Sequence, residues 1–300
     1  MTVREALQYG RKILNNSPSP ALDTDVFLQY LLGCDKTYLL LHSDDNLNDE
    51  IFKQLDEMLQ KRQTGLPVAY ITGHKEFYGI DFFVNQDVLI PKPDTEILVE
   101  ETLNVLADKV TLPNILTVCD MCTGSGCVGL SVLKNCIEEE LFSLEKMPSF
   151  FLADISRKAL DVAKKNIEHL NLNKYAHIVH SNLFDNTPKE FDVITANPPY
   201  VPLKETMELL KDGRNEPVLA LNGDVDTNTG DFSQSTDGLE VMRNLVPQAV
   251  EHLRTGGVLL VEAGEYNALK TEEIFKKNGL HSTRIIPDLE GQLRVITGIL

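Results

Sequence analysis

Apolar residues in the first quarter of the chain recur at helical spacing. They form three stripes, at residues 6–14, 26–32 and 51–59. Asp23 or Thr24 is a suitable N-cap for the second of these helices, and Gly33 is suited to end it. Stripes of this kind are typical of the buried faces of packed helices. The pattern predicts a small helical bundle, a domain of residues 1–73.

The next stretch changes from helical spacing to aromatic and β-branched residues. Residues 74–90 contain a glycine and an Asn-Gln-Asp break, which predicts a β-hairpin that links two domains. An apolar helix over residues 97–106 follows. Asp94 or Thr95 is placed to cap that helix.

From residue 115 onward, short apolar runs alternate with amphipathic stretches. The runs predict strands at residues 115–119, 150–153, 178–180, 193–196, 258–262 and 294–299. Helices are predicted to begin at 128 and to span 159–167, 239–253 and 269–277. Such alternation implies an α/β domain, residues 91–300, with a mostly parallel sheet and helices on both faces. Residues 224–236 are polar without apolar periodicity, which predicts a solvated loop.

Composition and charge narrow the classes of partner. Acidic residues number 45 and basic residues 28, which gives a net charge of −17. Direct nucleic-acid binding draws on clustered lysine and arginine, so this balance argues against that class. No apolar run approaches membrane-spanning length, and the N-terminus lacks a signal-peptide core. We therefore expect a cytoplasmic protein with no membrane partner.

The cysteines give no disulfide or metal framework. There are five, and Cys119 and Cys122 form a C-x-x-C motif. A zinc site would need a second pair of ligands, and a redox motif would need to open a helix, whereas this one straddles a strand end. We expect buried free thiols and no bound metal.

Polar clusters follow the ends of four consecutive predicted strands. They lie at residues 120–126, 154, 181–184 and 197–200. Glycines after the first strand let the backbone approach a ligand closely, and the carboxylate of Asp154 suits ribose hydroxyls. Because ligands of parallel sheets bind beyond the carboxyl ends of the strands, these clusters predict one site. Gly124-x-Gly126-x-x-Gly129 also matches a dinucleotide motif, but that chemistry gives no role to residues 197–200.

The stretch Asn197-Pro198-Pro199-Tyr200 is the most distinctive of the four. Two prolines cannot continue a strand ladder, and Asn197 is biased to an extended conformation by the proline that follows. Its amide and the neighbouring carbonyl groups suit a planar NH2 group, on which Tyr200 can stack. The simpler alternative is a turn that ends the strand.

With these stretches in place, the chain resembles the class I S-adenosylmethionine-dependent methyltransferases, and more closely the release factor glutamine N5-methyltransferase family. The resemblance runs from about Pro67 to the C-terminus. It is carried by residues 67–73, 76–77, 89–96, 120–126, 197–200, 216–217 and 237–238, by Glu262-x-Gly264 and by Asp288-x-x-Gly291-x-x-Arg294. The segment Ile-Pro-Lys-Pro-Asp-Thr-Glu at 90–96 is more specific than the Asn-Pro-Pro-Tyr stretch, which DNA-adenine enzymes share.

The resemblance implies a class I Rossmann-like fold, an S-adenosylmethionine cofactor and a role for each matching residue. The methionine part of the cofactor would pass Cys122, Thr123, Gly124, Ser125 and Gly126, its ribose would bind Asp154, and its adenine would lie against Asn182 and Leu183. Asn197 and the Pro198 carbonyl would hold the glutamine NH2 of a release factor, with Pro199 and Tyr200 completing the catalytic stretch. The helical domain would dock the release factor, and a monomer is expected.

Four features depart from the family pattern. Cys122 stands where glycine is common, Lys92 replaces a common arginine, and Asn182 replaces a common aspartate. Residues 224–236 read as an insertion between Gly223 and Asp237. These departures leave the Asn-Pro-Pro-Tyr chemistry intact.

Three other functions remain open at this point. A ribosomal-protein glutamine methyltransferase would share the site and differ in the docking domain. A DNA-adenine methyltransferase would need a basic face that this chain lacks. A non-catalytic adaptor that binds the cofactor is the third alternative.

Overall fold

The computed structural model describes residues 1–213 and 215–300, which form two compact units. Unit one comprises Met1–His74 with Leu209–Asn215, and unit two comprises Lys75–Glu208 with Glu216–Leu300. The expected division into domains 1–73, 74–90 and 91–300 stays a prediction.

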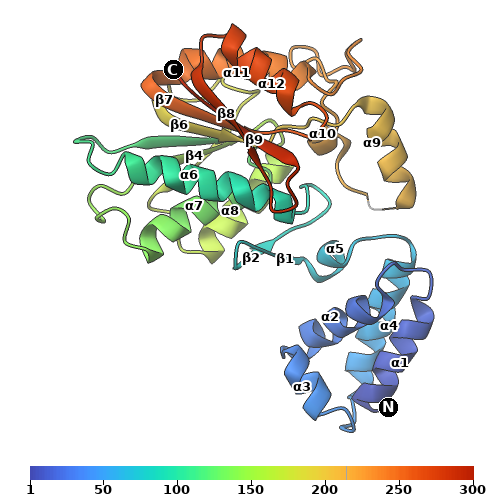
Figure 1. Ribbon diagram of the computed structural model, residues 1–300. Helices are drawn as coiled ribbons and strands as arrows, with labels where there is room; N and C mark the ends of the chain where they lie inside the picture. The colour runs from blue at the N-terminus through green and yellow to red at the C-terminus, as the bar shows by residue number, and fades with distance from the viewer. Residues whose placement is uncertain (214) are drawn as a thin grey trace. The chain divides into compact units, whose positions relative to one another are not determined.

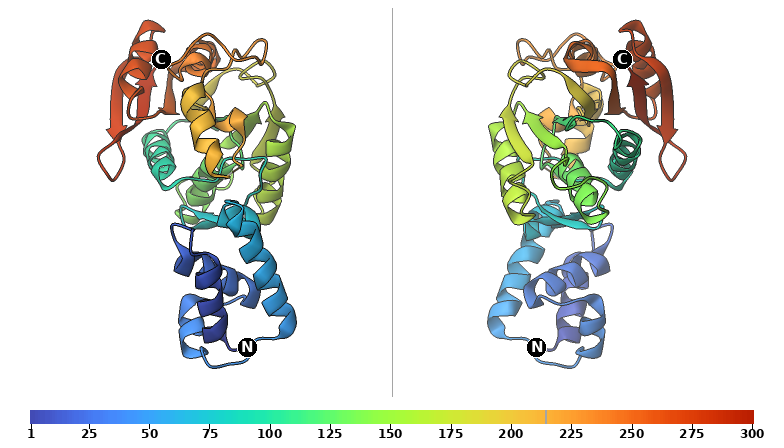
Figure 2. Two further views of the ribbon diagram at one scale, coloured as in Figure 1. Left: turned by 90° about the vertical axis from the view of Figure 1, so that its right-hand side faces the viewer. Right: turned by 90° about the vertical axis from the view of Figure 1, so that its left-hand side faces the viewer.

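Unit one contains the expected helical bundle (Figure 2, blue). Its helices are α1 (Val3–Ile13), α2 (Pro20–Leu32), α3 (Lys36–Leu41), α4 (Asp49–Gln63) and α5 (Val68–Thr72), with the 3-10 turn η2 (Leu210–Asp212). Phe27, Leu28, Leu55 and Leu59 are fully buried and form the centre of its core. The predicted apolar stripes are therefore the packed faces of this bundle.

The start of α2 differs from the prediction. The helix begins at Pro20 with Ser19 at the N-cap position, so Asp23 lies inside the first turn and does not cap it. Asp23 is buried, and it accepts hydrogen bonds from the Ser19 hydroxyl at 2.7 Å and from Arg62 Nε at 2.8 Å. Gly33 ends the helix in the left-handed conformation, φ 59°, as predicted.

The hairpin is shorter than expected. Its strands are β1 (His74–Phe77) and β2 (Ile80–Phe83), and residues 84–90 form no strand. In unit two, the buried amide of Asn166 accepts from the Phe83 N–H at 2.8 Å and donates to the carbonyl oxygens of Phe83 and Ser125 at 3.0 and 2.8 Å. This single side chain fixes the end of the hairpin against the glycine loop.

Unit two is built on a seven-stranded sheet within the described residues (Figure 1). The strands are β3 (Thr117–Met121), β4 (Ser149–Asp154), β5 (Ala176–His180), β6 (Phe191–Ala196), β7 (Leu253–Glu262), β8 (His281–Pro287) and β9 (Leu293–Ile299). Their order is β5-β4-β3-β6-β7-β9-β8, with β9 antiparallel to both neighbours and the first five strands parallel. The mostly parallel sheet is confirmed, whereas β8 was not predicted.

Helices cover both faces of this sheet (Figure 1). They are α6 (Glu96–Asp108) with the preceding turn η1 (Pro93–Thr95), α7 (Cys127–Glu138), α8 (Arg157–His169), α9 (Leu203–Leu209), α10 (Val218–Leu221), α11 (Glu240–His252) and α12 (Ala268–Lys277). Neighbouring residues of a strand enter opposite cores: Val118 packs with α6 and α7, and Cys119 packs with α11 and α12. The alternation confirms the predicted α/β arrangement.

The described residues contain neither a membrane-spanning helix nor a metal cluster. No helix among them combines the length and apolar character needed to cross a membrane. No group of three histidine, cysteine or acidic side chains among them could hold a metal ion. All five cysteines are free, as predicted, but only Cys119 and Cys136 are buried, whereas Cys34, Cys122 and Cys127 are partly exposed.

Candidate active site

A cleft in unit two lies at the carboxyl ends of β3, β4 and β6. The loop that follows β5 also lines it. The predicted site residues that line it are Cys122, Thr123, Gly124, Ser125, Asp154, Asn182, Leu183, Asn197 and Pro199. Of the other predicted residues, Gly126, Pro198 and Tyr200 are adjacent in sequence but are not among its described lining residues. The neighbours of β3 are β4 on one side and β6 on the other, so the cleft occupies the switch point of the sheet.

The side chain of Asp120, in β3, holds the loop that follows this strand. This buried carboxylate accepts hydrogen bonds from the Thr123 hydroxyl at 2.5 Å and from the Gly129 N–H at 3.0 Å. Burial raises the pKa of Asp120 to about 7, and these two hydrogen bonds oppose the shift. A Cβ at Gly129 would lie 2.6 Å from Leu152 Cδ2, so the third glycine of the motif serves close packing of α7 on the sheet.

The loop itself needs left-handed backbone at three positions. Gly124 and Gly126 have φ of 56° and 83°, and Cys122 has φ of 59°. A residue with a Cβ is strained in that region, whereas glycine is not. The departure at Cys122 therefore lies in its backbone conformation as well as in its side chain.

Asp154 lies at the end of β4 and ties two loops together. Its Oδ2 accepts from the Gly124 N–H and its Oδ1 from the Ser156 N–H, both at 2.9 Å. Burial raises the pKa of Asp154, and the backbone N–H groups lower it in part. Each carboxylate oxygen keeps a second lone pair, so the side chain can also accept from hydroxyl groups in the cleft.

Asn182 contacts the segment that was expected to be a solvated loop. Its Nδ2 donates to the Thr227 carbonyl oxygen at 2.7 Å, and Thr227 lines the same cleft. Asp224 and Val225 are buried, so the solvated-loop prediction is wrong for the start of this segment. The prediction took a polar segment to be exposed. Asp224 is instead buried, because its carboxylate accepts hydrogen bonds from the Leu203 N–H at 3.1 Å and the Gly238 N–H at 2.7 Å.

Asn197 follows β6 and has its NH2 group oriented by Thr95. The Asn197 Nδ2 donates to Thr95 Oγ1 at 3.2 Å. The Thr95 hydroxyl also lowers the pKa of Glu262, against the rise that burial causes. With its NH2 group directed at Thr95, Asn197 has an Oδ1 that accepts no hydrogen bond from the described residues.

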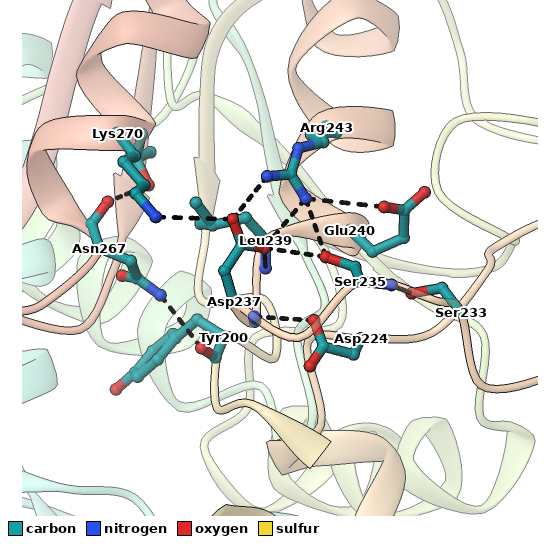
Figure 3. A network of polar contacts seen from close by, with 12 residues as sticks. Tyr200, Asp224, Ser233, Ser235, Asp237, Leu239, Glu240, Arg243, Asn267 and Lys270 are labelled. Carbon is teal, nitrogen blue, oxygen red and sulfur yellow. Dashed lines mark hydrogen bonds and ion pairs between the residues drawn. The ribbon is translucent and has the colours of Figure 1, made fainter. Parts of the chain in front are cut away.

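Tyr200 faces the same buried carboxylate. Its hydroxyl donates to Glu262 Oε1 at 3.0 Å. Its carbonyl oxygen accepts from Asn267 Nδ2 at 3.1 Å, as Figure 3 shows. Burial raises the pKa of both Tyr200 and Glu262. The sequence analysis assigned Glu262 and Thr95 no role in the site; the only signal was that both belong to stretches that carry the family resemblance. Thr95 was expected as a helix cap, and although it occupies that position its side chain caps nothing.

The replacement of a common arginine by Lys92 keeps an ion pair. Lys92 Nζ lies 2.7 Å from Oε1 of Glu216, whose side chain is buried. Both residues are in stretches that carry the resemblance, and the pair joins the start of η1 to the segment before α10. The lysine supplies the charge but not the bidentate fork.

Comparisons with known proteins identify the family of this chain. Residues 5–73 match the PrmC N-terminal domain, and residues 99–216 match the methyltransferase small domain. A release factor glutamine methyltransferase of Neisseria gonorrhoeae is 36% identical, over 95% of this chain and 95% of its own. Another, of Clostridium acetobutylicum, is 31% identical over 100% and 99% of the two chains.

A solved structure supports the fold alone. The catalytic domain of hMettl16, in complex with MAT2A 3'UTR hairpin 1, is 15% identical and has a TM-score of 0.51, covering 91% of this chain and 90% of its own. The full-length sequence matches above settle the family: this chain belongs to the release factor glutamine methyltransferases.

Proposed function

We propose that the protein transfers a methyl group from S-adenosylmethionine to the side-chain amide nitrogen of the glutamine in the Gly-Gly-Gln motif of peptide chain release factors. The observation that carries this proposal is the oriented amide of Asn197 at the cleft. Family membership and the names of the relatives support the same activity. A cytoplasmic monomer stays a prediction.

The residues of the cleft fit the cofactor. Asp154 offers carboxylate oxygens for ribose hydroxyls, Asn182 offers an amide oxygen for an adenine amino group, and Leu183 supplies an apolar wall. The glycine loop brings backbone close to the methionine part. When bound, the cofactor supplies an electrophilic methyl group on a sulfonium.

The role of the protein is to position a weak nucleophile. A glutamine amide nitrogen has its lone pair delocalised into the carbonyl group. Asn197 Oδ1 and the Pro198 carbonyl oxygen would accept the two N–H bonds, which aims the nitrogen and stabilises positive charge as it develops. The proton leaves during or after transfer, so no side chain is assigned as a base.

The first expected result concerns the cofactor. Replacing Asp154 by alanine removes the ribose acceptor and also frees the N–H groups of Gly124 and Ser156. We expect S-adenosylmethionine binding to weaken by about 1–3 kcal/mol, the cost of unpaired buried polar groups. Isothermal titration calorimetry measures this directly, and an unchanged dissociation constant would remove Asp154 from the site.

The second expected result concerns docking of the release factor by unit one. Its helix α3 exposes Leu40 and Leu41, with 67% and 78% of their surface accessible. Exposed neighbouring apolar side chains mark interaction surfaces. Replacing both leucines by aspartate should lower methylation of the intact release factor, while the rate with a free Gly-Gly-Gln peptide stays unchanged.

A matched control is available in unit two. Leu144 is 64% exposed and precedes β4, so it lies at the strand end opposite the cleft. Its replacement by aspartate should change neither rate. Equal rates on intact factor for the Leu40 and Leu41 double variant and the control variant would show that α3 does not contact the release factor.

A further inference from the structure

The inserted segment, residues 224–236, is folded as a compact turn. Val225 pairs with Phe232 in an antiparallel bridge. The Asp226 N–H donates to the Asp231 carbonyl oxygen at 2.9 Å, and the Gly230 N–H donates to the Asp226 carbonyl oxygen at 2.8 Å. These backbone bonds give the segment a defined shape.

The base of the segment is held by side chains of the following helices. Asp237 forms an ion pair with Arg243 at 2.7 Å and accepts from the Ser235 hydroxyl at 2.9 Å (Figure 3). Arg243 holds the pKa of Asp237 well below its usual range. Asp224 closes the other end through the Gly238 N–H at 2.7 Å.

The tip of the segment reaches the cofactor cleft. Val225, Asp226, Thr227 and Gly230 line it together with Asn182. Asn182, in the loop after β5, contacts this tip: its Nδ2 donates to the Thr227 carbonyl oxygen at 2.7 Å. A backbone carbonyl can only accept, so position 182 must supply a donor at this contact.

We propose that the inserted segment is a wall of the cofactor site and that Asn182 couples it to the adenine. The amide would donate to Thr227 with its nitrogen while its oxygen accepts from the adenine amino group. A carboxylate at 182 could serve the adenine but would place an oxygen against the Thr227 carbonyl. The inference rests on the proposed function, because it takes the cleft as the S-adenosylmethionine site.

The test measures S-adenosylhomocysteine binding by calorimetry to the wild-type protein and to Asn182→Asp. We expect the aspartate variant to bind at least about tenfold more weakly, the scale of one unsatisfied buried polar group. If the segment is not coupled to the adenine, the aspartate should bind as well as asparagine or better, since a charged acceptor makes the stronger hydrogen bond. That result would overturn the inference.

A deletion variant distinguishes loss of the contact between Asn182 and the segment from general damage to the site. In a chain that lacks residues 225–236, the Thr227 carbonyl is gone, so Asn182→Asp should no longer weaken binding. An equal penalty in both backgrounds contradicts the proposal. Hydrogen exchange on the full chain decides the matter if the shortened chain does not fold: ligand should slow exchange in residues 225–232 of the wild type and not of Asn182→Asp, and equal slowing in both contradicts the coupling. Failure of the wild type to bind ligand at all would instead refute the proposed function.

Discussion

Replacing Asn197 by alanine should lower the rate of methyl transfer by about two orders of magnitude or more, the scale measured for loss of one preorganised hydrogen-bond donor in an active site. The variant loses the acceptor for the substrate NH2 and leaves Pro198 to hold the amide alone. Cofactor affinity should change much less, because Asp154 and Asn182 bind other parts of the cofactor. Single-turnover transfer with saturating cofactor and release factor measures the effect.

The fold should survive this change. Asn197 follows the last residue of β6 and is only partly buried, so alanine leaves no large cavity in the core. Asn197→Asp is the matched variant: it keeps the acceptor but loses the donor to Thr95 and adds a charge. A folded Asn197→Ala protein with near-normal transfer would reduce residues 197–200 to a turn that ends a strand.

Replacing Thr95 by valine should lower the transfer rate by about 10- to 100-fold, the cost of a small misplacement of a reacting group. Valine matches the shape of threonine, but it removes the hydroxyl that accepts from Asn197. The amide of Asn197 would then be free to turn. The turnover number should fall while the dissociation constant of the cofactor stays near its original value.

Thr95→Ser provides the control for this positioning role. Serine keeps the hydroxyl and loses a methyl group, so its packing defect at a buried position is larger than that of valine. We expect serine to restore most of the rate. If valine and serine give equal rates, the Thr95 hydroxyl serves packing and stability, and the orientation of Asn197 has another cause.

The strands around the site could be predicted from sequence because each is a short apolar run with a polar or glycine-rich end. The runs at β3, β4 and β6 are buried on both faces, so they show as continuous apolar stretches. The strand β8 could not be found in this way. It is an edge strand, largely exposed, and its first residues His281-Ser282-Thr283-Arg284 are polar.

Contacts between residues that are far apart in the chain could not be predicted from the sequence. The hydrogen bonds from Asn197 to Thr95 and from Tyr200 to Glu262 connect the loop after β6 to η1 and to β7, and no spacing along the chain encodes them. The burial of Asp224 was missed for a related reason. A polar residue is taken to be solvated unless its backbone partners are known, and those partners lie at the first residue of α9 and after residues 224–236.

The most direct measurement of the central claim is methyl transfer from labelled S-adenosylmethionine to an intact release factor, with the modified residue located by mass spectrometry. Ribosomal proteins and DNA serve as parallel substrates. The account predicts one methyl group on the side-chain nitrogen of the Gly-Gly-Gln glutamine and its loss with Asn197→Ala. Label on a ribosomal protein or on DNA, with none on the release factor, would contradict it.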